Sequence, residues 1–141
     1  MSAETYSPKR VEVIVNGVPI RGYADGTFVN VARNSDSFAT NVGADGEVSR
    51  TASADRTGKV TVTLQQTSDS NDFLSGLVTA DELTLNLQFV LMVKDTNGRT
   101  LLVSPCAWID KPADSEFGNE LSNREWIISC AELNGLIGGN N

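Results

Sequence analysis

Three pairs of carboxylates are the groups in this chain whose types and spacing could do chemistry. They are Asp69 with Asp72, Asp81 with Glu82, and Asp114 with Glu116. Such pairs serve general acid–base catalysis or bind calcium through their oxygens. The best metal candidate is the segment Asp69–Asp72, but its Ser, Asn and Asp side chains are also those that begin a helix. We therefore expect helix capping there and solvated turns at the other two pairs.

Most other catalytic and metal chemistry is excluded by residue types that the chain lacks. It contains no histidine, which removes Ser-His-Asp and Cys-His catalysis and most zinc sites. Two isolated cysteines are too few for a thiolate zinc cluster. Gly43–Gly46 lacks the lysine and the serine or threonine of a phosphate-binding loop. The sequence therefore predicts a protein that is not an enzyme, with no catalytic residues, no metal site and no cofactor.

The two cysteines, Cys106 and Cys130, lie in apolar, strand-like contexts. In a chain whose first ten residues contain no apolar signal-peptide core, we expect both to be reduced and buried. A disulfide between them stays open as an alternative if the fold pairs their strands.

The charge balance argues against binding to nucleic acids or to membranes. The chain of 141 residues has 18 acidic and 11 basic side chains, a formal net charge of -7. Binding to DNA, or to an anionic membrane surface, depends on basic groups that neutralise phosphates. The longest purely apolar run, Phe89–Val93, is too short to cross a bilayer. We expect no membrane partner.

The elements that must position these residues are mostly strands. Two turn signals, Asn16-Gly17 and Asp95–Gly98, separate apolar runs as in β-hairpins. Alternating or apolar patterns predict strands at Val11–Val15, Val18–Ile20, Thr27–Arg33, Val60–Gln65, Leu83–Val93, Arg99–Ile109 and Glu125–Leu133, with two short strands around the turn at Ala44–Glu47.

A single helix is expected after the strand at Val60–Gln65. Ser70 is the predicted N-cap, and Asp72 in the first turn favours the helix dipole. An apolar stripe made by Phe73, Leu74, Leu77 and Val78 predicts packing on a sheet, and the helix should end near Ala80. The fold class is therefore mainly β: one domain over residues 1–141, an antiparallel β-sandwich or barrel of about eight strands with one short flanking α-helix.

Three segments are expected to lie outside the compact body. Residues 1–10 are polar and predict an N-terminal arm. Residues 34–58 are long, polar and dotted with glycine, which predicts an extended loop or hairpin with a function of its own. Residues 134–141 predict a flexible C-terminal tail.

The residues that carry the most specific signal lie in the middle of the chain. They are Val42–Arg50, Gly58–Ser68 and Ser70–Leu74, together with the opening Tyr6–Lys9 and the hairpin that follows it. In this order and spacing they resemble the tail tube, or inner tube, protein family of contractile-tailed bacteriophages. The resemblance covers most of the chain and weakens after about residue 110.

The resemblance implies two packed antiparallel sheets with one flanking helix, and a structural role. Six copies would form a ring, with one sheet of each copy joined edge to edge into a barrel around a lumen. Rings would stack into a tube inside the tail sheath and meet baseplate and terminator proteins. The viral DNA would pass through the lumen without specific binding. The protein would be assembled in the host cytoplasm and reside in the virion tail.

Two sets of residues are candidates for these roles. In the family a long hairpin reaches the neighbouring ring, which implies ring-stacking contacts in the extended segment at Glu47, Arg50, Asp55 and Arg56. Strands with one apolar and one uncharged polar face suit a wet tube wall. This predicts lumen-facing side chains at Thr61, Thr63, Gln65, Thr84, Asn86 and Gln88.

Two alternatives stay open at the level of sequence. One is another tail or baseplate component of the same fold. The other is a soluble β-sandwich binding module, which would present exposed aromatic side chains on a groove. Trp108 and Trp126 both lie in apolar strand contexts, which favours core packing for each.

Overall fold

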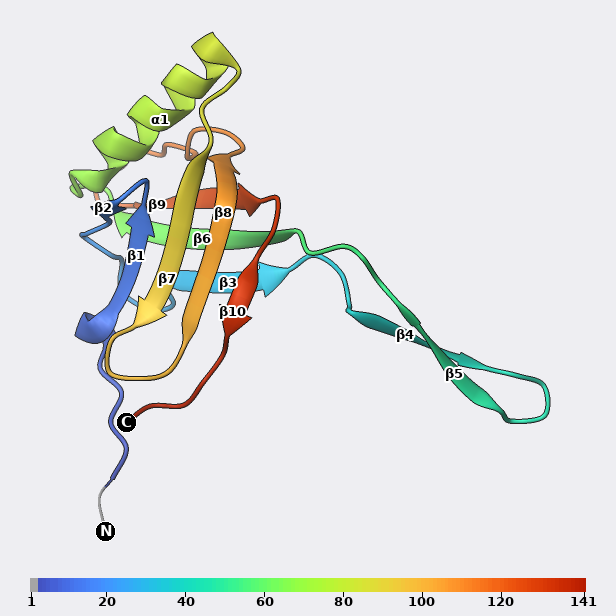
Figure 1. The fold of residues 1–141 in the computed structure, drawn as a ribbon. Coiled ribbons are helices and arrows are strands. Elements are labelled where there is room, and N and C mark those ends of the chain that lie inside the picture. The colour runs from blue at the N-terminus through green and yellow to red at the C-terminus, as the bar shows by residue number, and fades with distance from the viewer. Residues whose placement is uncertain (1–2) are drawn as a thin grey trace.

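The computed structural model of the protein describes residues 3–141 as a two-layered β-fold with one helix and one projecting hairpin (Figure 1). The predicted fold class is confirmed. The elements are the 3₁₀ turn η1 (Pro8–Arg10), β1 (Val11–Val15), β2 (Val18–Pro19), β3 (Val29–Arg33), β4 (Phe38–Val42), β5 (Val48–Ala52), β6 (Gly58–Gln65), α1 (Ser70–Thr84), β7 (Phe89–Asp95), β8 (Leu101–Ile109), β9 (Asn123–Cys130) and β10 (Asn134–Leu136).

Seven strands hydrogen-bond in one antiparallel series, β2-β1-β7-β8-β9-β6-β3, and β10 joins it beside β8. In Figure 1, β1, β7 and β8 form one layer, and β9, β6 and β3 form a second layer whose strands run across the first. β8 belongs to both layers, because its first half pairs with β7 and Ala107–Ile109 pairs with β9. The result is a sandwich of crossed sheets with a shared corner strand.

The corner strand carries an irregularity at Pro105. Phe89 pairs with Ala107 but Leu91 pairs with Ser104, so β8 has one more residue than β7 between these two pairs. Proline has no N–H to donate to a ladder, so it is tolerated at a bulge. The bulge bends β8 where it passes from one layer to the other.

The core lies between the two layers and under α1. Along β6, Val60, Val62 and Leu64 are buried, as the alternating pattern predicted. Trp126 from β9 is also buried, and its indole N–H donates to Asn71 Oδ1 at 3.0 Å. This aromatic side chain is core, as expected, whereas Trp108 is only half-buried.

The helix packs as predicted, but its two ends differ from the prediction. Leu74 and Val78 are buried, and Phe73 and Leu77 pack against the core. Ser70 is the first helical residue and not the N-cap; its Oγ accepts the backbone N–H of Arg21 at 2.9 Å. This hydroxyl therefore ties the helix to the segment after β2.

The helix also runs four residues beyond the predicted end at Ala80, to Thr84. Leu85 then adopts the left-handed conformation (φ 58°) and its N–H donates to Asp81 O at 2.7 Å. The Asp81 carboxylate accepts the N–H of Leu87 at 3.1 Å. Asp81 thus closes the helix C-terminus, which gives this acidic residue a structural role.

The predicted strand over Leu83–Phe89 is therefore wrong in its first six residues. Leu83 and Leu85 alternate with polar residues but are 81% and 85% exposed. A helix already formed extends at low cost, since each added residue gains a hydrogen bond. The strand begins only at Phe89, where both faces become apolar.

The prediction of a flexible tail at residues 134–141 is also wrong. Asn134–Leu136 forms β10 against the first residues of β8. Arg33 holds the start of the tail through Nε and Nη2, which donate to Leu133 O at 3.0 and 2.9 Å. Near its end, Asn140 Nδ2 donates to Asp95 Oδ2 at 2.6 Å. These partners lie far away in the sequence, which is why the local composition did not indicate them.

The N-terminal arm runs beside the C-terminus. Thr5 N–H donates to Asn141 O at 2.6 Å, and Asn97 Nδ2 donates to Thr5 O at 2.8 Å. The arm leads into β1 through η1. The first two residues of the predicted arm, Met1 and Ser2, lie outside the described residues.

Both cysteines are free thiols. Cys130 is buried and points into the sandwich, whereas Cys106 is half-buried and its thiol contacts Gln88 Oε1 at 3.3 Å. The reduced state is as expected, and the open alternative of a disulfide is wrong. Over residues 3–141, no helix has both the length and the hydropathy needed to cross a membrane.

Candidate assembly surfaces

The first candidate surface is the hairpin of β4 and β5, which projects away from the body (Figure 1). Every residue of both strands is exposed. The turn is closed by Gly43 N–H donating to Glu47 O at 2.8 Å, with Gly46 at φ 86°. The predicted extended segment is thus an ordered ribbon. A two-stranded hairpin is marginally stable alone in water.

The ribbon has two different faces. Its register places Phe38, Val42 and Val48 on one side, together with Arg50 and two smaller side chains. Phe38, Val42 and Val48 are 52%, 66% and 67% exposed. The Arg50 guanidinium lies over the Phe38 ring, 4.2 Å from its centroid. We call this side the apolar hairpin face: Phe38, Thr40, Val42, Val48, Arg50 and Ala52.

The four predicted stacking residues do not form one cluster. Glu47 lies at the turn and Arg50 lies on the apolar hairpin face, whereas Asp55 and Arg56 follow β5 at the hairpin base. Arg56 Nη1 donates to Ser53 O at 2.8 Å. The charges of the hairpin were predicted from the sequence, but the role of its apolar side chains was not. The signal was present, because Phe38, Val42 and Val48 are large apolar side chains in an otherwise mostly polar stretch.

Asp55 organises the hairpin base. Its carboxylate accepts the Ser35 hydroxyl at 2.6 Å, and the Thr57 hydroxyl and N–H at 2.7 and 2.9 Å. The hydrogen bonds from Ser35 and Thr57 lower the pKa of Asp55 to about 2, because they favour the ionised form. The Asp55 carboxylate therefore binds groups of its own chain and stabilises the loop from which the hairpin projects.

The second surface is the outward face of β3, β6 and β9. Thr61 lies in a row between Asn30 and Ile127, and Thr63 lies opposite Glu125. Thr61 and Thr63 are half-buried and Gln65 is exposed, on a strand whose alternate residues are buried. These three side chains therefore lie on the outward face of the strand, and their position at a lumen stays a prediction. We call this surface the polar sheet face; Lys59 and Glu125 are the charged residues in its rows.

Thr84, Asn86 and Gln88 do not join that face. Thr84 ends the helix, where its hydroxyl donates to Ala80 O at 2.8 Å, and the other two lie in the connection to β7. The prediction that they belong to a polar strand face is wrong, because Leu83–Gln88 forms no strand.

The third surface is the outward face of β1, β7 and β8. Ile14, Met92 and Val103 form one row across the three strands. The next row contains Glu12, Lys94 and Leu101, with Lys94 Nζ 3.6 Å from Glu12 Oε2. We call this surface the apolar sheet face: Glu12, Ile14, Val90, Met92, Lys94, Leu101 and Val103.

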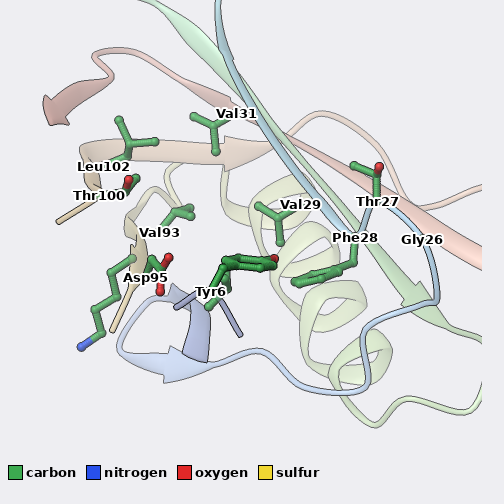
Figure 2. Close-up of a pocket in the computed structure, with 12 residues that line it drawn as sticks. Tyr6, Gly26, Thr27, Phe28, Val29, Val31, Val93, Asp95, Thr100 and Leu102 are labelled. Carbon is green, nitrogen blue, oxygen red and sulfur yellow. The ribbon is translucent and has the colours of Figure 1, made fainter. Parts of the chain in front are cut away.

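A hollow of about 400 Å³ opens between the two layers, lined by β3 on one side and by β7 and the start of β8 on the other. Figure 2 shows the side chains of Val29, Val31, Val93 and Leu102 turned toward it, with the ring of Tyr6 among them. Tyr6 comes from the N-terminal arm and is 56% exposed. The hollow is therefore lined by apolar side chains together with Lys94 and Asp95, and it is partly filled by the chain's own arm.

The sheet has an open edge along β3. The β3–β6 hydrogen bonds run from Phe28 to Asn34 on alternate residues. In an antiparallel pair, the intervening residues turn their polar groups the other way. The N–H and C=O groups of Val29, Val31 and Arg33 therefore point away from β6. Such an edge is a template for pairing with another chain.

The carboxylate pairs form no metal centre. Asp72 lies in the first turn of α1, and Lys111 Nζ lies 3.3 Å from Asp114 Oδ1 on an exposed turn. Within residues 3–141, no group of three or more ligand-type side chains is placed to hold a metal ion.

Crossed antiparallel layers with one flanking helix form the fold of contractile-injection-system tube and cap proteins. The anti-feeding prophage tube-terminating cap aligns with a TM-score of 0.63 at 10% identity, covering 96% of this chain and 93% of that one. The tube-containing structure of the PVC sheath–tube complex in its extended state aligns at 0.61 and 10% identity, covering 94% and 91%. At these identities the likeness concerns the fold.

Similarity in sequence identifies the family of the chain, and not only its fold. The family model described as Bacteriophage PhiTE tail tube protein matches residues 13–138. Structural protein ORF10 of Pseudomonas phage KPP10 is 33% identical over 144 residues, covering 96% of this chain and 83% of that protein. The chain belongs to the bacteriophage tail tube family. It is a structural tail component associated with the virion and not an enzyme, as predicted.

Proposed function

We propose that six copies of this chain form a ring, and that stacked rings form the inner tube through which viral DNA leaves the particle. The observation that carries this proposal is the match of residues 13–138 to a tail tube family. The open edge of β3 supports ring closure, since a free edge that stays unpaired is an aggregation hazard. A closed ring uses such edges and leaves none free.

The polar sheet face is the surface we assign to the lumen. Thr61, Thr63 and Gln65 present hydroxyl and amide groups, which water solvates well and which carry no charge for phosphates to bind. The alternative, the apolar sheet face, would expose Ile14, Met92 and Val103 to water along the whole channel. The overall acidity of the chain further disfavours adhesion of DNA.

The β4–β5 hairpin is the element we assign to contact between rings. It is ordered, it projects from the body, and none of its strand residues is buried in its own chain. The sheath, baseplate and terminator are the further partners of the proposed tube. One structure with this fold is described as a sheath–tube complex. Assembly in the host cytoplasm follows from the proposal.

A second candidate function is a cap or terminator at the end of the tube. It is favoured by two structures with this fold, one described as a tube-terminating cap and the other, at a TM-score of 0.57, as a sheath/tube terminator. A terminator forms one ring and stops, whereas a tube protein stacks through both ring faces.

Negative-stain electron microscopy of the purified protein over a range of concentrations tests the proposal. We expect sixfold rings that convert into tubes of uniform bore as the concentration rises. Single rings that never stack would favour the terminator. A protein that stays monomeric at every concentration and salt condition would refute both assignments.

A further inference from the structure

Two apolar surfaces of this chain are left uncovered by the chain itself, and they match. We propose that the apolar hairpin face of one copy packs on the apolar sheet face of a second copy, so that side-chain burial and not charged pairs drives the contact between copies. This inference rests on the proposed tube function and identifies the partner surface of its projecting hairpin.

The hairpin cannot cover its own apolar face. In Figure 1 it continues the direction of β3 and β6 away from both layers. Phe38, Val42 and Val48 are each more than half exposed, and all three lie on one side of the ribbon. Large apolar side chains gathered on one side of an exposed element mark an interaction site.

The apolar sheet face is the matching acceptor. In Figure 1 this side of β1, β7 and β8 faces the viewer, with no helix in front of it. Val90 and Leu101 are 50% and 42% exposed, and the row of Ile14, Met92 and Val103 lies between them. Apart from the Glu12–Lys94 pair this face is apolar, whereas the water-facing side of such a sheet is usually polar.

The two surfaces agree in size. Phe38 to Val42 spans four residue steps along β4, and Val90 to Lys94 spans four along β7. At about 3.3 Å per residue both lengths are about 13 Å. The ribbon is two strands wide and the acceptor is three, so the hairpin fits on it as a short second sheet, as in aligned sandwich packing.

The charges agree as well. Arg50 is the only charged residue on the apolar hairpin face. Glu12 is the only carboxylate on the apolar sheet face, and its side chain stays 45% exposed beside Lys94. An Arg side chain can pack its stem on apolar surface and bring its guanidinium to a carboxylate at the rim.

The hollow beside Tyr6 is a poorer acceptor. It is lined also by the charged residues Lys94 and Asp95, and Tyr6 already occupies part of it. The five-residue strands of the hairpin present a flat face, which fits a flat sheet better than a slot.

The interface that results joins different patches on the two copies. Each copy offers a hairpin to one neighbour and a sheet to another, so the contact propagates into a ring or a stack and does not stop at a dimer. This property is what a tube requires.

A matched pair of hairpin variants tests whether burial of the apolar hairpin face drives the contact between copies. Val48→Asp places a carboxylate on the apolar hairpin face, and Ser49→Asp places the same group one residue away on the opposite face. We expect Val48→Asp to raise the concentration needed for assembly at least about tenfold, the ratio that corresponds to ~1.4 kcal/mol. Ser49→Asp should assemble like the parent. Equal effects of both variants, or no effect of either, would overturn the proposal.

Photo-crosslinking tests the partner surface. A benzophenone side chain at position 42 should form links between copies, and mass spectrometry should map them to β1, β7 and β8 at residues such as Ile14, Val90 and Val103. Links to the hollow near Tyr6, links between two hairpins, or no links between copies in assembled material would each overturn it. Electron microscopy of the same sample separates the two claims: tubes with links elsewhere refute this inference alone, whereas a lasting monomer refutes the tube function too.

Discussion

Replacing the hairpin by a short turn separates folding of the body from assembly. The change substitutes residues 38–52 with Asn-Gly, between Ser37 and Ser53, whose N–H to O distance is already 2.8 Å. Because no residue of β4 or β5 is buried, the body loses no core contact. We therefore expect the sandwich to fold and the rings to stop stacking.

The size of the stability change can be worked out from loop closure. Shortening a connection from fifteen residues to two is about three halvings, and each halving contributes ~0.6 kcal/mol. The free energy of unfolding should therefore stay the same or rise by up to ~2 kcal/mol. As a control for the assay, Leu74→Ala removes a fully buried side chain from α1 and should cost about 2–5 kcal/mol.

Urea unfolding, followed by the fluorescence of the buried Trp126, measures the free energy of unfolding of both variants. Sedimentation velocity measures their assembly. A hairpin replacement that lowers the free energy of unfolding by more than ~2 kcal/mol would show that the hairpin belongs to the folding unit. Normal tubes from the same variant would refute the role of the hairpin in stacking.

Three further predictions concern the tail, the thiols and pH. Gly135→Ala should displace β10, because Gly135 has φ 147° and a Cβ there would clash with the Leu101 carbonyl. We expect faster amide exchange at residues 134–141 while the body stays folded. Unchanged exchange rates at these residues would contradict the prediction. Cys130 is buried, and burial raises the pKa of its thiol. A thiol reagent should therefore label Cys106 in the native protein and Cys130 only after unfolding. Labelling of both thiols at the same rate would be inconsistent with the fold. The pKa of Asp55 is lowered to about 2, so its contribution to the hairpin base is present above pH ~4 and lost as pH falls toward 2. Amide exchange at the hairpin base should become faster over that pH range, and Asp55→Asn should remove this pH dependence. An Asp55 carboxyl that titrates near pH 4 by NMR would refute the prediction.

The parts of the fold that depend on local pattern were predictable from the sequence. β1 and its turn at Asn16-Gly17 lie where alternation and turn chemistry placed them, and both turn residues have positive φ. The same holds for β6, since a one-residue shift would expose Val60 and its buried neighbours. The hairpin between β3 and β6 followed from the turn at Asp45-Gly46.

The parts that depend on distant partners were not predictable. β10 exists because of β8 and Arg33, neither of which is near it in the sequence. The alternation at Leu83–Phe89 suggested a strand, but the helix continues to Thr84 and the Asp81 carboxylate binds the N–H of Leu87 just beyond it. The assembly surfaces divide in the same way: Thr61 could be assigned to a polar face, whereas the exposure of Val42 depends on the hairpin leaving the body.

A cryo-electron microscopy reconstruction of the assembled protein would show directly how the copies join and which face lines the lumen. We expect six copies per ring, a neighbouring strand hydrogen-bonded to the open edge of β3, and Thr61, Thr63 and Gln65 facing the lumen. A tube whose lumen is lined by Ile14, Met92 and Val103, or a ring in which the edge of β3 stays free, would contradict it.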